Sequence, residues 1–262
     1  MSAAQRWAAE LAAWRIPQEI LDQAPQSPWI HPVELFRVDD EAPIPDSPSH
    51  RLAREVLPAV GGTVLDIGCG GGRAAFALAP PAVRVYGVDH QQAMLDAFAA
   101  TADRRGLAHH AVLGDWPDVA EDALIADVAV AHHVVYNVAD LHTFALVAGA
   151  HARRRVVFEL PERHPLAWMA PLWRHFWGLE RPNGPTADDA LAVLQEALLP
   201  ARLTTWSEDG EPRAALSPAK RVEFTRIRLC LPASRDPEVA EVLAAQPEPG
   251  PRRLAAIWWD VD

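Results

Sequence analysis

The chain has 262 residues, a formal net charge of −11 and 50% hydrophobic residues, a size and composition typical of one α/β domain with insertions. No apolar run approaches the roughly 18 residues that a membrane-spanning helix needs, and the acidic balance argues against binding to the phosphate backbone of nucleic acid. The two cysteines are too few for a disulfide framework, and the first residues lack the pattern of a secretory signal. We therefore expect a cytoplasmic protein that binds neither membrane nor nucleic acid.

The middle of the chain alternates β-branched runs with Ala- and Leu-rich stretches, a pattern typical of βαβ units. Strands are expected at residues 63–67, 83–88, 110–113, 127–131, 156–160, 202–206 and 254–259. Helices are expected at residues 73–78, 91–105, 139–150, 187–199, 218–229 and 237–243. The pattern predicts a Rossmann-like α/β fold, with a seven-stranded, mainly parallel twisted sheet and helices on both faces.

Two segments lie outside this alternation. Residues 1–58 begin with a helical pattern and continue as a Pro-rich stretch, which predicts an N-terminal cover. Residues 161–186 form an insertion after the fifth strand of the main domain, which we place at residues 59–262. Both segments carry tryptophans that either line an apolar pocket for a ligand or pack the covers onto the sheet. They are Trp7, Trp14, Trp29, Trp168, Trp173 and Trp177.

An apolar strand runs into a glycine-dense turn in the sequence VLDIGCGGGR, residues 64–73. Glycines let a ligand approach the backbone closely, and the helix that follows offers free N–H groups at its start. The spacing Gly70-x-Gly72-x-x-Ala75 fits a variant of the dinucleotide fingerprint, which favours an NAD(P)-dependent oxidoreductase. Asp66 at the mouth of the turn would repel a pyrophosphate, however, and favours a ligand that carries an ammonium group.

The same segment resembles motif I of the class I S-adenosylmethionine-dependent methyltransferases. Three further segments resemble the later motifs of that family in the same order: VYGVDHQQAML at residues 85–95, GDW at 114–116 and DVAVAHHVVYNV at 127–138. The likeness is close over roughly residues 60–160. It implies a Rossmann-like seven-stranded fold, S-adenosyl-L-methionine as cofactor and S-adenosyl-L-homocysteine as product.

The resemblance also implies roles for individual residues. Asp66 and the backbone of the turn would hold the methionine end of the cofactor, and Asp89 would accept hydrogen bonds from the two ribose hydroxyls. Asp115 would accept from the adenine amino group, while the end of the fourth strand would face the sulfonium. By the same resemblance, Gly68, Cys69 and Gly70 would contact the methionine end of the cofactor, His90, Met94 and Trp116 would surround the adenine ring, and His132 would lie at the strand end.

Methyl transfer is an in-line displacement, so alignment of the acceptor supplies much of the acceleration and a base is needed only for a protonated acceptor. His133 and Tyr136 are the first candidates for that base because they follow the fourth strand. Further candidates are His132, Glu159, His164 and His175. No metal-ligand spacing is present, so no metal is expected. We predict a methyltransferase acting on a small molecule; the alternatives are a cofactor-binding protein without turnover and the oxidoreductase.

Overall fold

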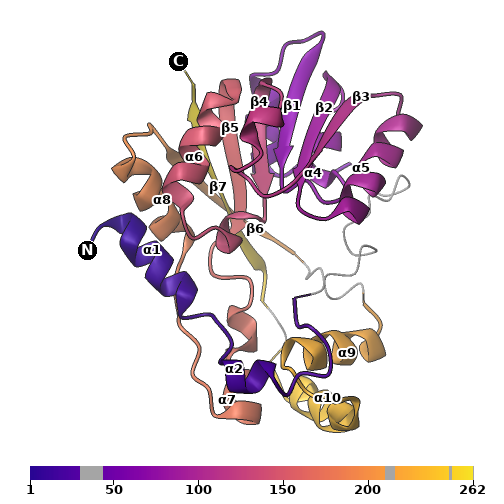
Figure 1. Ribbon diagram of the computed structural model, residues 1–262, viewed down its shortest axis with the longest axis vertical. Helices are drawn as coiled ribbons and strands as arrows, with labels where there is room; N and C mark the ends of the chain where they lie inside the picture. Colours follow the sequence, from indigo (N-terminus) through magenta and orange to yellow (C-terminus); the bar gives the residue numbers. More distant parts are fainter. Residues whose placement is uncertain (30–43, 210–215, 248–249, 262) are drawn as a thin grey trace.

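The computed structural model describes residues 1–29, 44–209, 216–247 and 250–261, and it contains one seven-stranded sheet in the order β3-β2-β1-β4-β5-β7-β6 (Figure 1). The strands are β1 (Gly62–Ile67), β2 (Ala82–Asp89), β3 (Ala108–Leu113), β4 (Ala126–His132), β5 (Ala152–Pro161), β6 (Arg202–Glu208) and β7 (Arg252–Asp260). Only β7 runs antiparallel to its neighbours, β5 and β6. All seven predicted strands and the mainly parallel sheet are therefore confirmed.

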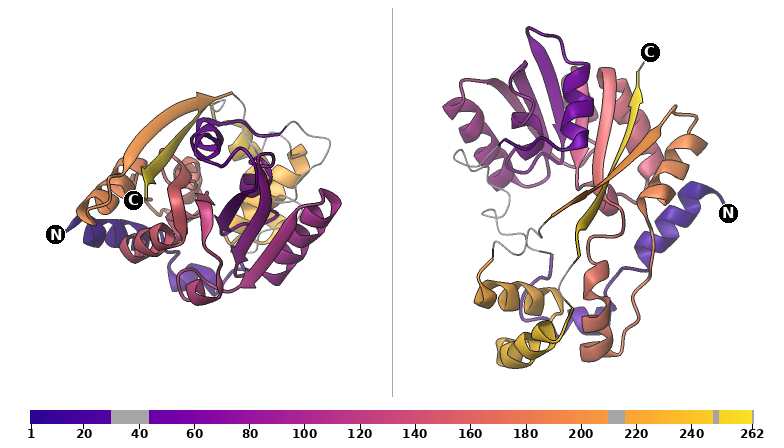
Figure 2. Two further views of the ribbon diagram at one scale, coloured as in Figure 1. Left: turned by 90° about the horizontal axis from the view of Figure 1, so that it is seen from above. Right: turned by 180° about the vertical axis from the view of Figure 1, so that it is seen from behind.

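Helices cover both faces of the sheet, as predicted (Figures 1 and 2). One face packs against α3 (Pro48–Glu55), α4 (Arg73–Phe76) and α5 (Gln92–Arg104). The other packs against α1 (Ala3–Ala12), α6 (Leu141–Ala150) and α8 (Ala187–Glu196). Fully buried Phe76 and Phe98 belong to the first core, and Phe144 and Trp7 belong to the second. Both faces of the sheet are thus buried, as a parallel sheet requires.

The remaining helices form a separate lobe below the carboxyl edge of the sheet (Figure 1). They are α2 (Gln18–Leu21), α7 (Ala170–Trp177), α9 (Pro218–Arg228) and α10 (Asp236–Ala244). Their buried side chains make a third core that includes Ile20, Met169, Trp173 and Val239. The helical lobe is made of α2, of the segment after β5 and of the segment between β6 and β7. Because β5 leads into it at its carboxyl end, the lobe lies where ligands bind in open α/β sheets.

The described N-terminal helices pack in three different places. In the structure α1 packs on the sheet domain through Trp7, α2 joins the helical lobe, and α3 lies against β5 and β7. The insertion after β5 packs with α9 and α10, which the sequence pattern did not separate from the helices of the sheet. Contacts between distant segments, rather than chain order, therefore define the lobe.

The tryptophans of the covers are mostly packing residues. Trp7 is fully buried and its indole N–H donates to the Val138 carbonyl at 2.8 Å. Trp14 stacks on His164 with ring centroids 3.9 Å apart, and Trp173 is buried in the helical lobe. Trp29 is instead 49% exposed. The structure thus favours the packing interpretation for Trp7, Trp14 and Trp173 over an aromatic pocket. No helix in the described part of the chain combines the length and apolarity that a membrane span requires.

Candidate functional site

The glycine turn after β1 depends on backbone angles that side chains rarely adopt. Gly68, Gly70 and Gly72 have φ values of +68°, +50° and +89°. A Cβ atom at Gly68 would lie 2.5 Å from Val134 Cγ2, and one at Gly72 would lie 2.2 Å from Phe76 Cε2. The predicted close approach of ligand and backbone therefore coincides with a turn that only glycine can make without strain.

Two buried carboxylates flank this turn. Asp66 lies on β1 and is only 1% exposed, and its Oδ2 accepts a hydrogen bond from the Ala75 N–H at 3.1 Å. Burial raises the pKa of Asp66 to about 7. Asp89 ends β2, and its oxygens accept from the Gly70 and Gln91 N–H groups, each at 2.9 Å. A carboxylate oxygen can accept a second hydrogen bond. Asp89 is thus fixed in orientation by the turn and keeps acceptor capacity for a ligand.

Three further residues predicted to contact the cofactor, Cys69, His90 and Met94, differ in how exposed their side chains are. The Cys69 thiol is buried, and burial raises its pKa well above the usual value, so it is not an activated nucleophile. The N–H groups of Cys69 and Gly68 both donate to the Val88 carbonyl. The His90 side chain is 63% exposed, with Nδ1 lying 3.8 Å from Asp89 Oδ1, whereas Met94 is buried on α5.

The loop after β3 brings the third motif beside Asp89. The Gly114 N–H donates to the Asp89 carbonyl at 3.0 Å, and the next residue, Asp115, is exposed. Trp116 turns toward α6: its indole N–H donates to the Phe144 carbonyl at 3.3 Å, and its ring meets His151 edge-on. Asp115 is therefore free to reach a ligand near Asp89, while a role for Trp116 beside an adenine ring stays a prediction.

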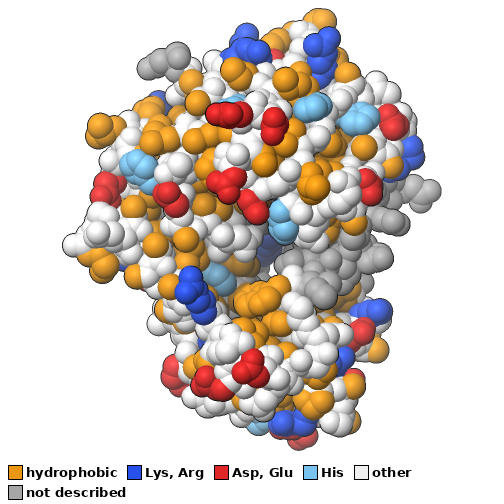
Figure 3. All heavy atoms as spheres, in the orientation of Figure 1, with side chains coloured by type: hydrophobic (Ala, Val, Ile, Leu, Met, Phe, Trp, Pro, Cys, Tyr) orange, Lys and Arg blue, Asp and Glu red, His pale blue; other side chains and the backbone are white. Residues whose placement is uncertain are grey.

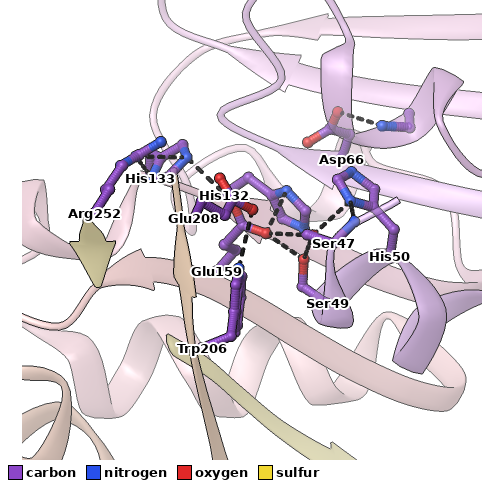
Figure 4. Close-up of polar contacts among 11 residues, drawn as sticks. Ser47, Ser49, His50, Asp66, His132, His133, Glu159, Trp206, Glu208 and Arg252 are labelled. Atoms are coloured by element: carbon purple, nitrogen blue, oxygen red, sulfur yellow. Dashed lines mark hydrogen bonds and ion pairs between the residues drawn. The ribbon is translucent and has the colours of Figure 1, made fainter. Parts of the chain in front are cut away.

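A second polar cluster lies at the carboxyl edge of β4 and β5 (Figure 4). His132 pairs in register with Glu159, and Glu159 with Ala256 on β7. Neighbours in register point to the same face of a sheet, and Asp66 shares that face because it pairs with Val130 of β4. The cluster is thus continuous with the glycine turn along the face that α3, α4 and α5 cover.

Glu159 is the centre of this cluster. It is 5% exposed, and its Oε2 accepts from the hydroxyls of Ser47, at 2.9 Å, and of Ser49, both at the start of α3. Its Oε1 lies 3.3 Å from His133 Nε2. Burial works against the charge, but the neighbouring imidazoles and the Ser49 hydroxyl hold the pKa of Glu159 well below its usual range. Glu159 is therefore an ionised carboxylate and a poor proton acceptor.

His133 lies at the rim of the cluster. Its φ of +62° is rare for a residue other than glycine, and its N–H donates to the Glu159 carbonyl at 2.7 Å. Its side chain is 42% exposed, and Arg252 Nη2 lies 3.3 Å from its Nε2 and 3.5 Å from its Nδ1. Strained backbone angles concentrate at functional sites. Of the two predicted bases, His133 is thus accessible and tightly oriented.

Two other histidines of the cluster are buried and neutral. Burial lowers the pKa of His132 to about 3, and it also lowers the pKa of His50. The two rings meet edge to face with centroids 4.9 Å apart. His50 Nδ1 lies 2.7 Å from the Ser47 hydroxyl, which ties the ring to the start of α3. His132 is thus a buried wall of the site and an unfavourable place for a proton.

Tyr136 is the predicted base that the structure does not favour. Its side chain is buried, its hydroxyl donates to the Pro161 carbonyl at 2.9 Å, and its ring stacks on Trp7. Burial raises the pKa of Tyr136 well above its usual range. A phenol in this state packs α1 onto the sheet and has little tendency to release or accept a proton.

Four residues of the cluster were missed by the sequence interpretation: Ser47, Ser49 and His50 in the Pro-rich stretch and Arg252 at the start of β7. They lie far from His133 and Glu159 in sequence, and their only local signal is the helix-start pattern of Ser47 followed by proline. Within residues 1–29, 44–209, 216–247 and 250–261, His, Cys, Asp and Glu side chains nowhere gather in threes as metal ligands would.

The comparisons with known proteins agree with this geometry. Residues 64–153 match the family model described as "Methyltransferase domain". The fold is similar to that of the YcgJ protein from Bacillus subtilis, which is 15% identical with a TM-score of 0.54 over 81% of this chain and 97% of that chain. It is also similar to a protein of Bacillus halodurans assigned as a methyltransferase, at 15% identity and a TM-score of 0.52 over 81% and 96% of the two chains.

A third likeness is to a protein of Galdieria sulphuraria assigned as a sarcosine dimethylglycine methyltransferase, at 14% identity and a TM-score of 0.53 over 82% of this chain and 83% of that one. No curated protein matches the sequence. The structural likenesses establish the fold, and the family match spans the glycine turn, Asp89, Asp115 and the His132–His133 strand end. Residues 64–153 are therefore similar to a methyltransferase domain, and the fold of the chain is that of the three solved structures.

Proposed function

We propose that this protein transfers the methyl group of S-adenosylmethionine to a small-molecule acceptor in the cytoplasm. The observation that carries the proposal is the pair of buried carboxylates, Asp66 and Asp89, on either side of a turn built from glycines in left-handed conformations. A cofactor with an ammonium group at one end and ribose hydroxyls at the other matches the two carboxylates.

The residues present fit this cofactor. The spare acceptor capacity of Asp89 suits two ribose hydroxyls, and exposed Asp115 beside it suits the adenine amino group. Asp66 and the Gly68–Gly70 backbone are placed for the methionine end. Bound S-adenosylmethionine would supply a methyl group on a positively charged sulfur, activated for displacement.

The oxidoreductase alternative fits less well. A dinucleotide would bring its pyrophosphate to the start of α4, where the Asp66 carboxylate accepts from the Ala75 N–H. Two like charges in a buried place repel each other strongly. The turn would therefore oppose NAD(P), whereas an ammonium group would be attracted to Asp66.

The acceptor site is proposed to lie between the carboxyl edge of the sheet and the helical lobe. The molecule narrows between these two parts on the face shown in Figure 3. Helices over the edge favour a small acceptor rather than a protein or a nucleic acid, and the net charge of −11 points the same way. His133 is proposed as the base for an acceptor that must lose a proton.

The proposal is tested by incubating the protein with S-adenosylmethionine and a broad metabolite panel and following S-adenosylhomocysteine by mass spectrometry. Turnover of a panel member that is lost in His133→Ala supports the assignment. Binding of the cofactor without turnover of any member would favour the alternative of a binding protein that has lost catalysis.

A further inference from the structure

The His50 side chain on α3 carries a buried nitrogen whose partner the described residues do not supply. His50 is 4% exposed, and its Nδ1 lies 2.7 Å from the Ser47 hydroxyl (Figure 4). Its Nε2 is buried and has no hydrogen-bond partner among the described residues, and the same holds for Nε2 of the neighbouring His132 ring. Buried polar atoms are nearly always paired in native proteins, so two unpaired nitrogens on adjacent rings point to a ligand.

The α3 helix holds His50 over the carboxyl end of β4. Ala53 lies one turn further along the helix, on the same side as His50, and packs into the core that contains Val64 of β1 and Ala75 of α4. The His50 ring meets the His132 ring edge to face, with centroids 4.9 Å apart, and His132 is the last residue of β4. His50 therefore lies at the end of the sheet face that α4 also covers.

This position is beside the first part of the glycine turn. In the pairing of β1 with β4, Asp66 is in register with the residue two positions before His132, so His132 is level with Gly68. A Cβ atom at Gly68 would lie 2.5 Å from Val134 Cγ2, so the chain that leaves β4 runs directly past the turn. Asp66 and Gly68 are proposed to hold the methionine end of the cofactor. His50, in contact with His132, is thus next to that end.

Four N–H groups of the turn are already used within the protein. Those of Gly68, Cys69, Gly70 and Gly72 all donate to protein acceptors. The Asp66 carboxylate attracts the ammonium group of an amino acid but repels its carboxylate. A further polar partner from a neighbouring element would complete the binding of this end of the cofactor.

His50 can pair with either charged group of an amino acid. Burial lowers the pKa of His50, so the ring is neutral at neutral pH. Nε2 of a neutral imidazole is either an N–H donor or a lone-pair acceptor. The carboxylate of the methionine portion accepts from the first form, and its ammonium donates to the second. The pairing of Nε2 with this end of the cofactor thus does not depend on which ring nitrogen carries the proton.

We propose that His50 binds the cofactor, with Nε2 paired to the amino-acid group of the methionine portion beside Asp66. The inference rests on the proposed function, because it needs S-adenosylmethionine in the turn. The hydroxyls of Ser47 and Ser49 hold the start of α3 on Glu159 of β5, which fixes His50 in place. The N-terminal segment then contributes directly to cofactor binding, through a residue that belongs to none of the sequence motifs.

Two ligands that differ only beyond the sulfur test the proposal. S-adenosylhomocysteine carries the amino-acid group, whereas 5′-methylthioadenosine has the same adenosine and sulfur without it. In calorimetric titrations of the full-length protein, His50→Asn should weaken binding of S-adenosylhomocysteine about tenfold or more and leave binding of 5′-methylthioadenosine unchanged. The asparagine amide can replace Nδ1 beside Ser47 but does not reach the position of Nε2. His50→Gln, whose amide does reach it, should retain most of the affinity.

The ratio of the two affinities separates binding from packing. Arg51→Gln is the matched control on the same helix, because Arg51 is exposed and pairs with Asp46; it should change neither affinity. Equal weakening of both ligands in His50→Asn, or an unchanged affinity for S-adenosylhomocysteine, would overturn the proposal. If His50→Asn does not fold, His50→Phe, which keeps a ring of similar size, is judged by the same ratio. Failure of the wild type to bind S-adenosylhomocysteine would instead refute the cofactor assignment.

Discussion

Replacement of Asp89 by alanine should weaken cofactor binding and lower stability at the same time. The Asp89 carboxylate holds the Gly70 and Gln91 N–H groups at 2.9 Å each, so it fixes the turn before any ligand arrives. The same oxygens are proposed to accept the ribose hydroxyls. Two separate losses are therefore expected from one substitution.

Hydrogen bonds to a charged group contribute about 1.5–3 kcal/mol, so Asp89→Ala should raise the Kd for S-adenosylhomocysteine about 10- to 150-fold. The partly buried N–H of Gly70 would lose its partner, which costs about 1 kcal/mol in the free energy of unfolding. Calorimetric titration gives the first quantity and urea unfolding of the ligand-free protein gives the second.

Asp115→Ala is the matched control. Asp115 is exposed and close to Asp89 along the same edge, so its removal should affect cofactor affinity with the free energy of unfolding changed by less than about 0.5 kcal/mol. If folded Asp89→Ala binds S-adenosylhomocysteine as tightly as the wild type, the ribose assignment is wrong.

Three further outcomes are expected. Affinity for S-adenosylhomocysteine should increase as pH rises toward about 7 and level off above it, because Asp66 has its pKa raised by burial and must ionise to attract the ammonium group; in Asp66→Asn, titrations across pH should show this dependence removed. Gly72→Ala should lower the free energy of unfolding by roughly 2–4 kcal/mol, measured in urea, since it combines a φ of +89° with a clash on Phe76. Trp7→Ala should cost about 3–5 kcal/mol in the same assay while leaving cofactor affinity unchanged; a selective loss of affinity would restore the pocket interpretation.

The sheet and the cofactor turn were predictable from the sequence because their signals are local. Strand β1, the glycines at 68, 70 and 72 and the acid that ends β2 lie within a short stretch, where apolar runs and turn residues follow each other in order. The short run predicted at residues 110–113 corresponds to β3, which pairs with β2 over the longer stretch Ala108–Leu113.

The helical lobe and the surroundings of His133 were not predictable in the same way. Ser49 and Arg252 reach Glu159 and His133 only after the sheet has assembled, and neither carries a motif. Tyr136 follows β4 in sequence as a base would, yet its ring turns under α1 onto Trp7. Position in the chain fixed which edge these residues occupy, and tertiary packing decided where each side chain points.

The central claim is that the turn between Asp66 and Asp89 binds S-adenosylmethionine. Calorimetric titration of the protein with S-adenosylhomocysteine, and in parallel with NAD(H) and NADP(H), tests it directly. The account predicts binding of S-adenosylhomocysteine with a Kd on the order of micromolar and no heat with either dinucleotide. Binding of a dinucleotide without binding of S-adenosylhomocysteine would contradict it.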